Sequence, residues 1–172
     1  MSAADNEAAI RHGIEQIFNL GNLAVLDERC TPDVVVHSPA QAEPMHGRAT
    51  LEEFVLRLRT AFPDLHVAID DLVADDRTVV TRCTTRGTQD GDYFGVPPTG
   101  SRVRMTEVQI FRIADGRIVE LWLVFNVLDV LQQLGVVPAG GLPRPLLLLL
   151  ARLRRRRNRR RALSGSGSYA RG

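Results

Sequence analysis

A carboxylate and an amide two residues apart, Glu107 and Gln109, are the side chains in this sequence best suited to chemistry. The run around them, Val103 to Ile113, is rich in β-branched and apolar residues and predicts a strand. Since alternate residues of a strand point to one face, Met105 and Phe111 would lie beside them. A carboxylate among such residues loses its hydration, which raises its pKa and makes it usable as a base or acid near neutral pH. Glu107 is therefore the first catalytic candidate.

Each of these two residues also has a structural interpretation. Glu107 would then lie near the rim of the sheet or pair with Arg82 or Arg104. Gln109 could donate to a developing oxyanion without exchanging a proton, or it could satisfy a neighbouring polar group in a pocket. The sequence leaves both pairs of alternatives open.

His37 and Arg82 complete the polar candidates. His37 ends a short predicted strand, where a neutral imidazole could relay a proton or orient a carbonyl, or could serve as a structural hydrogen-bonding group. Arg82, in VVTRCTT, is expected to bind an anionic or carbonyl-bearing substrate, with surface pairing to acidic residues as the alternative.

The strand over Arg117–Phe125 contributes an apolar stripe. Its alternate residues Leu121, Leu123 and Phe125 share one face, whereas Trp122 lies on the other, where a large aromatic side chain is usually a core or dimer contact. Tyr93 lies in GDYFGVPPTG, a stretch with flanking glycines that is either a lid over the pocket or an ordered connection between strands. The residues expected to contact substrate are Leu121, Leu123, Phe125, Met105, Phe111, Arg82 and Tyr93.

The elements that must position these residues begin as helices and continue as strands. Helical spacing predicts helices at about 6–20, Leu23–Cys30 and 50–61, the last opened by a capping box of Thr50 and Glu53. Period-two alternation and β-rich composition predict strands at Asp33–His37, Leu65–Ile69, Val79–Thr88, Val103–Ile113 and Arg117–Phe125, with a hairpin turn at Asp115-Gly116. A last helix, Val127–Leu134, would be capped by Asn126 and ended by Gly135. This order predicts an α+β domain in which helices cover one face of a curved antiparallel sheet.

Charge divides the 172 residues into a domain and an extension. All 20 acidic residues lie in residues 1–143 with 12 of the 22 arginines, which gives a net charge of −8, and residues 144–172 hold the other ten arginines. We expect a domain over 1–138 and an extension over 139–172, first Leu-rich, then Arg-rich, and Gly/Ser-rich at its end. The extension would be a disordered or helical basic tail, and its arginine run 152–161 could contact polyanions or an anionic membrane without sequence specificity. It could also fold back on the acidic domain or have no function.

The remaining features favour a cytoplasmic protein without a metal. Cys30 and Cys83 are isolated, which is unlike a metal site or a disulfide framework. The N-terminus lacks the basic and then apolar order of a secretory signal. The apolar run from Leu146 to Ala151 is far shorter than the roughly 20 residues of a transmembrane helix.

Several stretches together resemble the SnoaL-like polyketide and ester cyclases. They are NLGNLAVLDERCTPDVVVHSP, AFPDL, GDYFGVPPTG, IFRIADGRIVE and VLQQLGVVP, and the similarity runs from about residue 6 to 138. The resemblance implies a cone-shaped α+β barrel, shared with ketosteroid isomerase and the nuclear transport factor, in which the sheet wraps around about three N-terminal helices. It also implies cofactor-independent ring closure by intramolecular aldol condensation, with an aspartate on the last strand exchanging protons in an apolar pocket.

This sequence departs from the family at the positions that move protons. The aspartate position is Leu123, and two positions that are often histidine are Leu121 and Gln109, so that of the short E-H-W-D-like motif only Trp122 remains. Two functions therefore stay open. The first is a cyclase or isomerase for a hydrophobic, polyketide-like carbonyl compound, with Glu107, Gln109 and His37 replacing the missing groups. The second is a non-catalytic domain that binds small molecules or mediates dimerisation. A homodimer formed through the outer sheet face around Trp122 is expected from the fold.

Overall fold

The computed structural model describes residues 2–138 and 140, and residues 1–136 form one compact unit. The first helix, α1 (Ala3–Ile14), continues without a break into the π-helical turn η1 (Glu15–Asn19). The helix begins earlier than predicted because Ser2 caps it: Ser2 Oγ accepts from the Asp5 amide, and the Asp5 carboxylate accepts from the Ser2 amide. The extension at 139–172, with the arginine run 152–161 and its expected contacts, lies outside the described residues apart from Gly140.

Two shorter stretches correct the predicted boundaries. The helix α2 (Val25–Arg29) ends before Cys30, which instead opens strand β1 (Cys30–His37), so Pro32 lies within this strand and does not precede it. The helix α3 (Arg48–Ala61) begins after Gly47, whose φ of 86° favours glycine, and no side chain caps it. The capping box predicted for Thr50 and Glu53 is therefore wrong, and Glu53 instead pairs with Arg57 one helical turn later.

Six strands form one curved sheet in the order β2-β1-β6-β5-β4-β3. The remaining strands are β2 (Met45–His46), which was not predicted, β3 (His66–Ala74), β4 (Thr78–Thr88), β5 (Arg102–Ala114) and β6 (Arg117–Phe125). All neighbours are antiparallel except β1 and β6, which run parallel. The α+β class is confirmed, but β2 and β3 end the sheet without pairing to each other, so the barrel is open.

The predicted hairpin between β5 and β6 is confirmed. Its two turn residues, Asp115 and Gly116, have φ values of 49° and 75°. Two positive φ values are what a two-residue turn needs to match the twist of the flanking strands. The pairing shifts by one residue between Ile113 and Arg112, so the neighbours of the candidate catalytic residues depend on this irregularity as well as on the turn.

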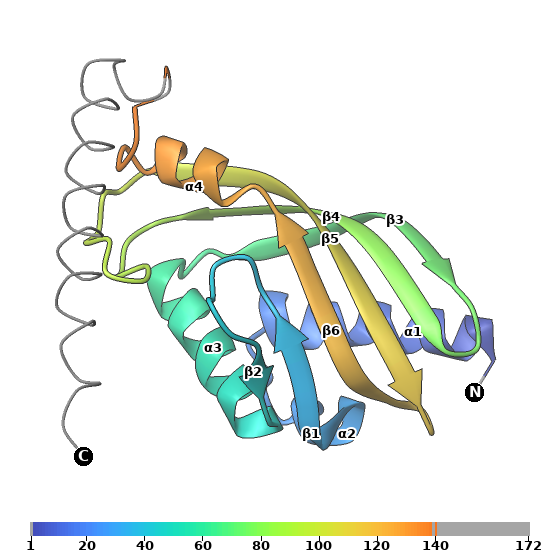
Figure 1. Ribbon diagram of the computed structural model, residues 1–172. Helices are drawn as coiled ribbons and strands as arrows, with labels where there is room; N and C mark the ends of the chain where they lie inside the picture. Colours follow the sequence, from blue (N-terminus) through green and yellow to red (C-terminus); the bar gives the residue numbers. More distant parts are fainter. Residues whose placement is uncertain (1, 139, 141–172) are drawn as a thin grey trace, which may run out of the picture. The chain divides into compact units, whose positions relative to one another are not determined.

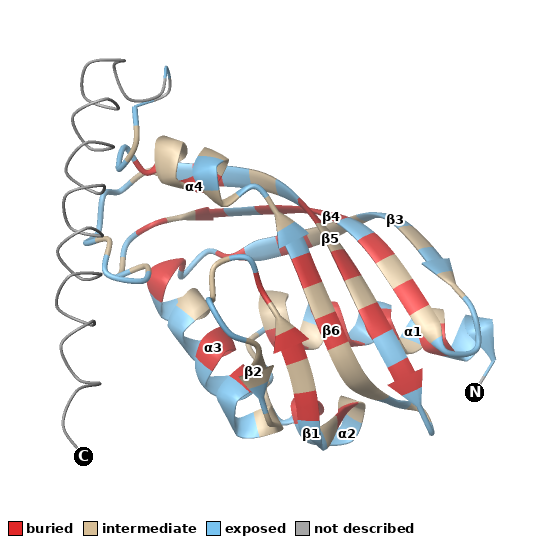
Figure 2. Ribbon diagram, in the orientation of Figure 1, coloured by how far each residue is buried: buried red, intermediate tan, exposed pale blue. Residues whose placement is uncertain are grey.

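The helices cover the concave face of the sheet, which we call the inner face (Figure 1). Buried and exposed residues alternate along the central strands, as the red and paler bands of Figure 2 show. Ile10 and Ile14 of α1 and Val55 of α3 belong to one buried cluster with Phe111 and Leu121 of the sheet. The inner face is thus the hydrophobic core of the domain.

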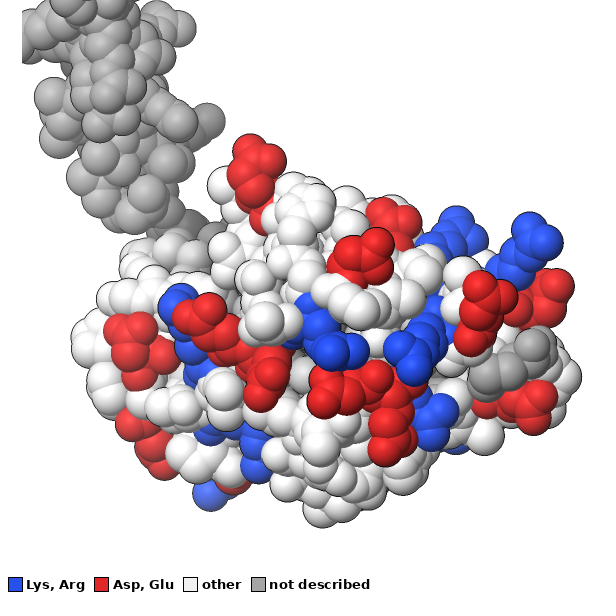
Figure 3. Space-filling view, turned by 90° about the horizontal axis from the view of Figure 1, so that it is seen from below, with Lys and Arg blue, Asp and Glu red and all other residues white. Residues whose placement is uncertain are grey.

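The outer surface of the domain carries both signs of charge. Over the face seen in Figure 3, acidic and arginine side chains are interspersed. Neighbouring helical turns form ion pairs, for example Arg11 with Glu7. Exposed pairs of this kind stabilise a helix only slightly. In the part of the chain that the structure describes, no helix has the length and apolar character that crossing a bilayer requires.

A last helix, α4 (Val127–Gln133), closes one end of the domain. As predicted, Asn126 caps it by accepting from the Asp129 amide. The side-chain amide of Gln133 donates to the Arg104 carbonyl and accepts from the Arg104 backbone amide, both at 2.9 Å. These are the two hydrogen bonds that a neighbouring strand would make. Val130 is buried against the end of β5, so α4 is fixed to the sheet by both polar and apolar contacts.

The connection between β4 and β5 is organised by one buried amide. Gln89 is fully buried, and its Nε2 donates to the carbonyls of Gly91, Val96 and Pro97 at 3.0–3.1 Å. Its Oε1 accepts from the amide and the hydroxyl of Thr99. Five hydrogen bonds from one side chain hold the loop that carries Tyr93 in one conformation.

Replacing Gln89 by Leu should lower the free energy of unfolding by on the order of 3 kcal/mol, because several backbone groups lose their partners inside the loop. Urea denaturation of the two proteins measures the difference. Gln41→Leu is the matched control, since the Gln41 side chain makes no hydrogen bond within the described residues. A loss of under about 0.5 kcal/mol in Gln89→Leu would contradict this role for the amide.

Candidate functional site

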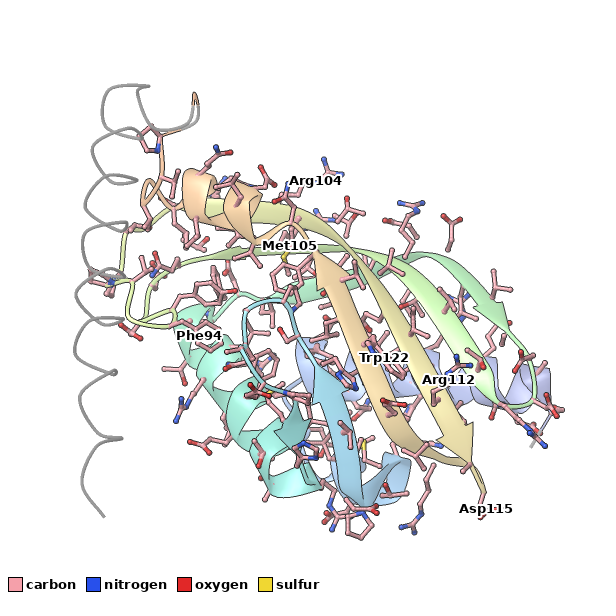
Figure 4. The ribbon with its side chains drawn as sticks, in the orientation of Figure 1. Phe94, Arg104, Met105, Arg112, Asp115 and Trp122 are labelled. Carbon is pink, nitrogen blue, oxygen red and sulfur yellow. The ribbon has the colours of Figure 1, made fainter. Side chains whose placement is uncertain are left out.

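Strand register brings the polar candidates of the inner face together. On β5, Glu107 lies opposite Cys83 of β4 and Phe125 of β6, and Gln109 lies opposite Thr81 and Leu123. All these side chains are on one face of the sheet because paired positions share a face. Met105, two residues before Glu107, lies at the end of β5 that α4 covers (Figure 4).

Glu107 is a buried carboxylate with two hydrogen-bond donors. Its Oε1 accepts from Thr85 Oγ1 at 2.6 Å and from Gln109 Nε2 at 3.1 Å. Glu107 is 6% exposed and Gln109 is 2% exposed. Burial raises the pKa of Glu107, and the hydrogen bonds from Thr85 and Gln109 lower it by a smaller amount. The structure therefore holds a carboxyl group whose charged form is disfavoured.

Glu107 forms no ion pair with Arg82 or Arg104 in the described part of the chain. Arg82, which was expected to be its partner or to bind substrate, follows Thr81 on β4 and so faces the opposite side of the sheet. There its guanidinium contacts Asp71 at 2.5 Å and Asp70 at 2.9 Å. Arg82 is thus removed from the candidate site, and the alternative of surface pairing holds for it.

His37 is also on the outer face. It pairs in register with Trp122, whose indole stacks on the imidazole with ring centroids 4.7 Å apart. Its Nε2 lies 2.8 Å from Glu120 Oε1. The sheet therefore separates His37 from Glu107, and the structure does not bring these two predicted residues together. Sequence could not show this, since the face of β1 depends on its pairing with β6.

Two small cavities lie along the inner face. The first, which we call the inner cavity, is lined almost entirely by apolar side chains, has a volume of about 40 Å³, and includes the predicted residues Phe111 and Leu121. The second, the rim cavity, is about 20 Å³ and includes Met105, Tyr93 and Thr85. Cavities of this size accommodate water molecules, so a larger ligand requires side chains between them to move.

The other predicted contact residues lie in the core between these cavities. Leu123 belongs to the main buried cluster, and Phe125 packs against both clusters of the core. Neither lines the inner cavity or the rim cavity, and the same holds for Glu107 and Gln109. The predicted side chains thus share one face, but in this conformation they fill the space that a substrate would need.

The loop between β4 and β5 borders the rim cavity. Tyr93 packs edge-on against Phe62 with centroids 5.2 Å apart, and burial raises its pKa to about 12. Phe94, labelled in Figure 4, is 44% exposed and has a φ of 50°, which is uncommon for a residue with a side chain. Its ring lies against Phe54 of α3. These aromatic contacts attach the loop to α3 and to Phe62 beside the rim cavity.

Thr85 is the site residue that sequence reasoning missed. It shares the inner face with Thr81 and Cys83, which period-two alternation along β4 could have indicated. That it reaches Glu107 depends on the pairing of β4 with β5, where Thr85 lies opposite Met105. A lone threonine in a strand gave no signal of this contact.

Comparison with known proteins agrees with the resemblance found in the sequence. A family model described as SnoaL-like polyketide cyclase matches residues 8–134. No curated protein matches the chain in sequence. Solved structures do match, and the three described next each cover at least three quarters of this chain.

A crystal structure from Jannaschia sp. CCS1, assigned as a SnoaL-like polyketide cyclase, is 25% identical with a TM-score of 0.73, and covers 79% of this chain and 95% of that one. IdmH from Streptomyces antibioticus, assigned as a polyketide cyclase, is 35% identical with a TM-score of 0.65, and the coverage is 76% and 98%. AclR from Streptomyces galilaeus, assigned as a hydroxylase, is 28% identical with a TM-score of 0.70, and the coverage is 93% and 98%.

The family model spans most of the 172 residues, and the described fold is the one that these structures share. The predicted family is therefore confirmed: this chain belongs to the SnoaL-like polyketide cyclases.

Proposed function

We propose that this protein is a cyclase or isomerase that acts without a cofactor on an apolar, polyketide-like carbonyl compound, with Glu107 transferring the proton. The observation that carries the proposal is the buried Glu107 carboxyl, held by two donors on one oxygen. A carboxyl group with a raised pKa can take a proton from carbon and return it near neutral pH. Membership of the cyclase family supports this type of reaction.

The two hydrogen bonds indicate which oxygen exchanges the proton. Thr85 and Gln109 both donate to Oε1, so this oxygen acts as an acceptor in either protonation state. The proton of the neutral acid therefore belongs on Oε2. The donors fix the orientation of the carboxyl group and leave its second oxygen for the substrate.

The position of Glu107 also suits the region where the family's aspartate acts. Leu123 occupies that aspartate position and lies opposite Gln109, so Glu107 is its diagonal neighbour on the next strand. Diagonal neighbours on one face are roughly 7–8 Å apart, which is within reach of a glutamate side chain. A carboxyl group from β5 could thus serve a reacting carbon that lies over β6.

One observation favours the alternative, a domain that binds an apolar molecule without reaction. The inner cavity is apolar and Glu107 does not line it, so a small ligand could lie there without contacting the carboxyl group. The proposals differ in whether Glu107 contributes to proton transfer, which the following variants measure.

Glu107→Gln should slow proton exchange at the α-carbon of a bicyclic ketone by at least about 100-fold, because the amide cannot act as a general base. Exchange at C1 of 2-tetralone in D₂O, followed by proton NMR, provides the measurement without knowledge of the natural substrate. Val73→Ala, which alters an exposed residue of β3, is the control and should keep the wild-type rate. Equal exchange by Glu107→Gln and wild type would favour the binding domain.

Thr85→Val should move the midpoint of the pH–rate profile of this exchange to higher pH. The Thr85 hydroxyl lowers the pKa of Glu107, so its removal raises that pKa further and reduces the ionised base at a given pH. At high pH, where both proteins are ionised, the rates should converge. A midpoint that does not move would exclude Thr85 as a residue that tunes Glu107.

Glu107→Gln should also stabilise the protein at pH 7–8, and less so in acid. Folding raises the pKa of Glu107 above the unfolded value of about 4.3. At a pH between the unfolded and the folded pKa, the folded protein therefore binds more protons than the unfolded protein. The stabilising effect of neutral Glu107 is complete below about pH 4.3 and is lost as pH rises through the folded pKa. Urea denaturation at several pH values measures the difference between the two proteins, and a difference that stays constant from pH 4 to 8 would contradict the burial argument.

A further inference from the structure

The side-chain carbonyl of Gln109 is a buried acceptor without a partner. Gln109 is almost fully buried, and no donor in the described part of the chain reaches its Oε1. Native structures satisfy nearly all such groups, through the protein or through a bound molecule. This oxygen therefore marks a point on the inner face at which an additional hydrogen-bond donor would be stabilising.

Rotation of the amide does not remove the problem. Gln109 Nε2 donates to Glu107 Oε1 at 3.1 Å, and with Glu107 ionised, the form that acts as a base, exchanging the two amide atoms would bring two acceptor oxygens together. Thr85 already donates to the same carboxyl oxygen at 2.6 Å, which confirms its use as an acceptor. The orientation of Gln109 is thus determined by Glu107, and its carbonyl stays free.

Its neighbours in the sheet do not supply the donor. Thr81, opposite Gln109 on β4, accepts from Cys83 Sγ at 3.4 Å, and its own hydroxyl group makes no hydrogen bond to Gln109 Oε1. Leu123, opposite on β6, has no polar side-chain atom. Within the described residues no donor is supplied, so a bound molecule on the inner face could provide it.

We propose that Gln109 Oε1 accepts a hydrogen bond from the hydroxyl or enol group of an apolar ring compound bound beside Glu107. This inference rests on the proposed function and specifies its ligand. The sequence left open whether Gln109 donates to an oxyanion or satisfies a neighbouring polar group. In the structure one of its two N–H bonds is used on Glu107, and the atom without a partner is its carbonyl oxygen. An O–H group satisfies the carbonyl of Gln109, whereas a ligand oxygen that can only accept would be repelled by it. The site therefore selects the enol or hydroxyl form of its ligand.

The test compares two probes that differ in one donor, 2-naphthol and its methyl ether, 2-methoxynaphthalene. Isothermal titration calorimetry with the full chain should give 2-naphthol about tenfold tighter binding, equivalent to about 1.4 kcal/mol. Gln109→Leu should bind the two probes with about equal affinity, and it should bind the ether at least as tightly as the wild type does. Val73→Ala should keep the wild-type preference, and thermal melting shows whether each variant is folded.

Three results would overturn the assignment: equal binding of the two probes by wild type, binding of neither, or a naphthol preference that persists in Gln109→Leu. The wild-type comparison decides the matter even if the variant does not fold. Binding and proton exchange are independent readouts. A naphthol preference that needs Gln109, together with unimpaired exchange in Glu107→Gln, would support the hydrogen bond to Gln109 and refute the catalytic role of Glu107. Impaired exchange in Glu107→Gln without a naphthol preference would support the catalytic role of Glu107 and refute the hydrogen bond to Gln109.

Discussion

The burial of Glu107 is the constraint on which the inner face depends. An ionised carboxylate is strongly disfavoured away from water unless donors compensate it. Here Thr85 and Gln109 provide two donors, both on one oxygen, and no arginine approaches from the described strands on that face. The result is a carboxyl group that is held in position but is only partly stabilised as an anion, a condition suited to proton transfer.

The surrounding architecture maintains this condition by excluding water. Helices α1 and α3 cover the inner face over most of its length, and α4 covers the end near Met105. The loop held by Gln89 adds Tyr93 to the wall of the rim cavity. Hydrogen bonds from Gln89 hold the loop, and those of Gln133 hold α4 against the sheet.

Polar side chains have charged partners on the outer face of the sheet and neutral hydrogen-bond donors on the inner face. On the outer face, Arg82 pairs with two aspartates and His37 contacts Glu120 beside Trp122. On the inner face, Glu107 has only neutral donors, and the family's aspartate position is occupied by Leu123. Burial raises the pKa of Glu107, and the hydrogen bonds from Thr85 and Gln109 offset this rise only in part.

The sequence by itself determined the α+β class, the family, the hairpin at Asp115-Gly116, and the common face of Met105, Glu107, Gln109 and Phe111. These features are local, since period-two alternation and turn chemistry operate within a few residues. Only the tertiary structure decided that Thr85 reaches Glu107, that His37 and Arg82 face outward, and that the Gln109 carbonyl lacks a donor. Such facts depend on the pairing of strands distant in the chain, and a shift of one residue in that pairing would turn every side chain to the opposite face.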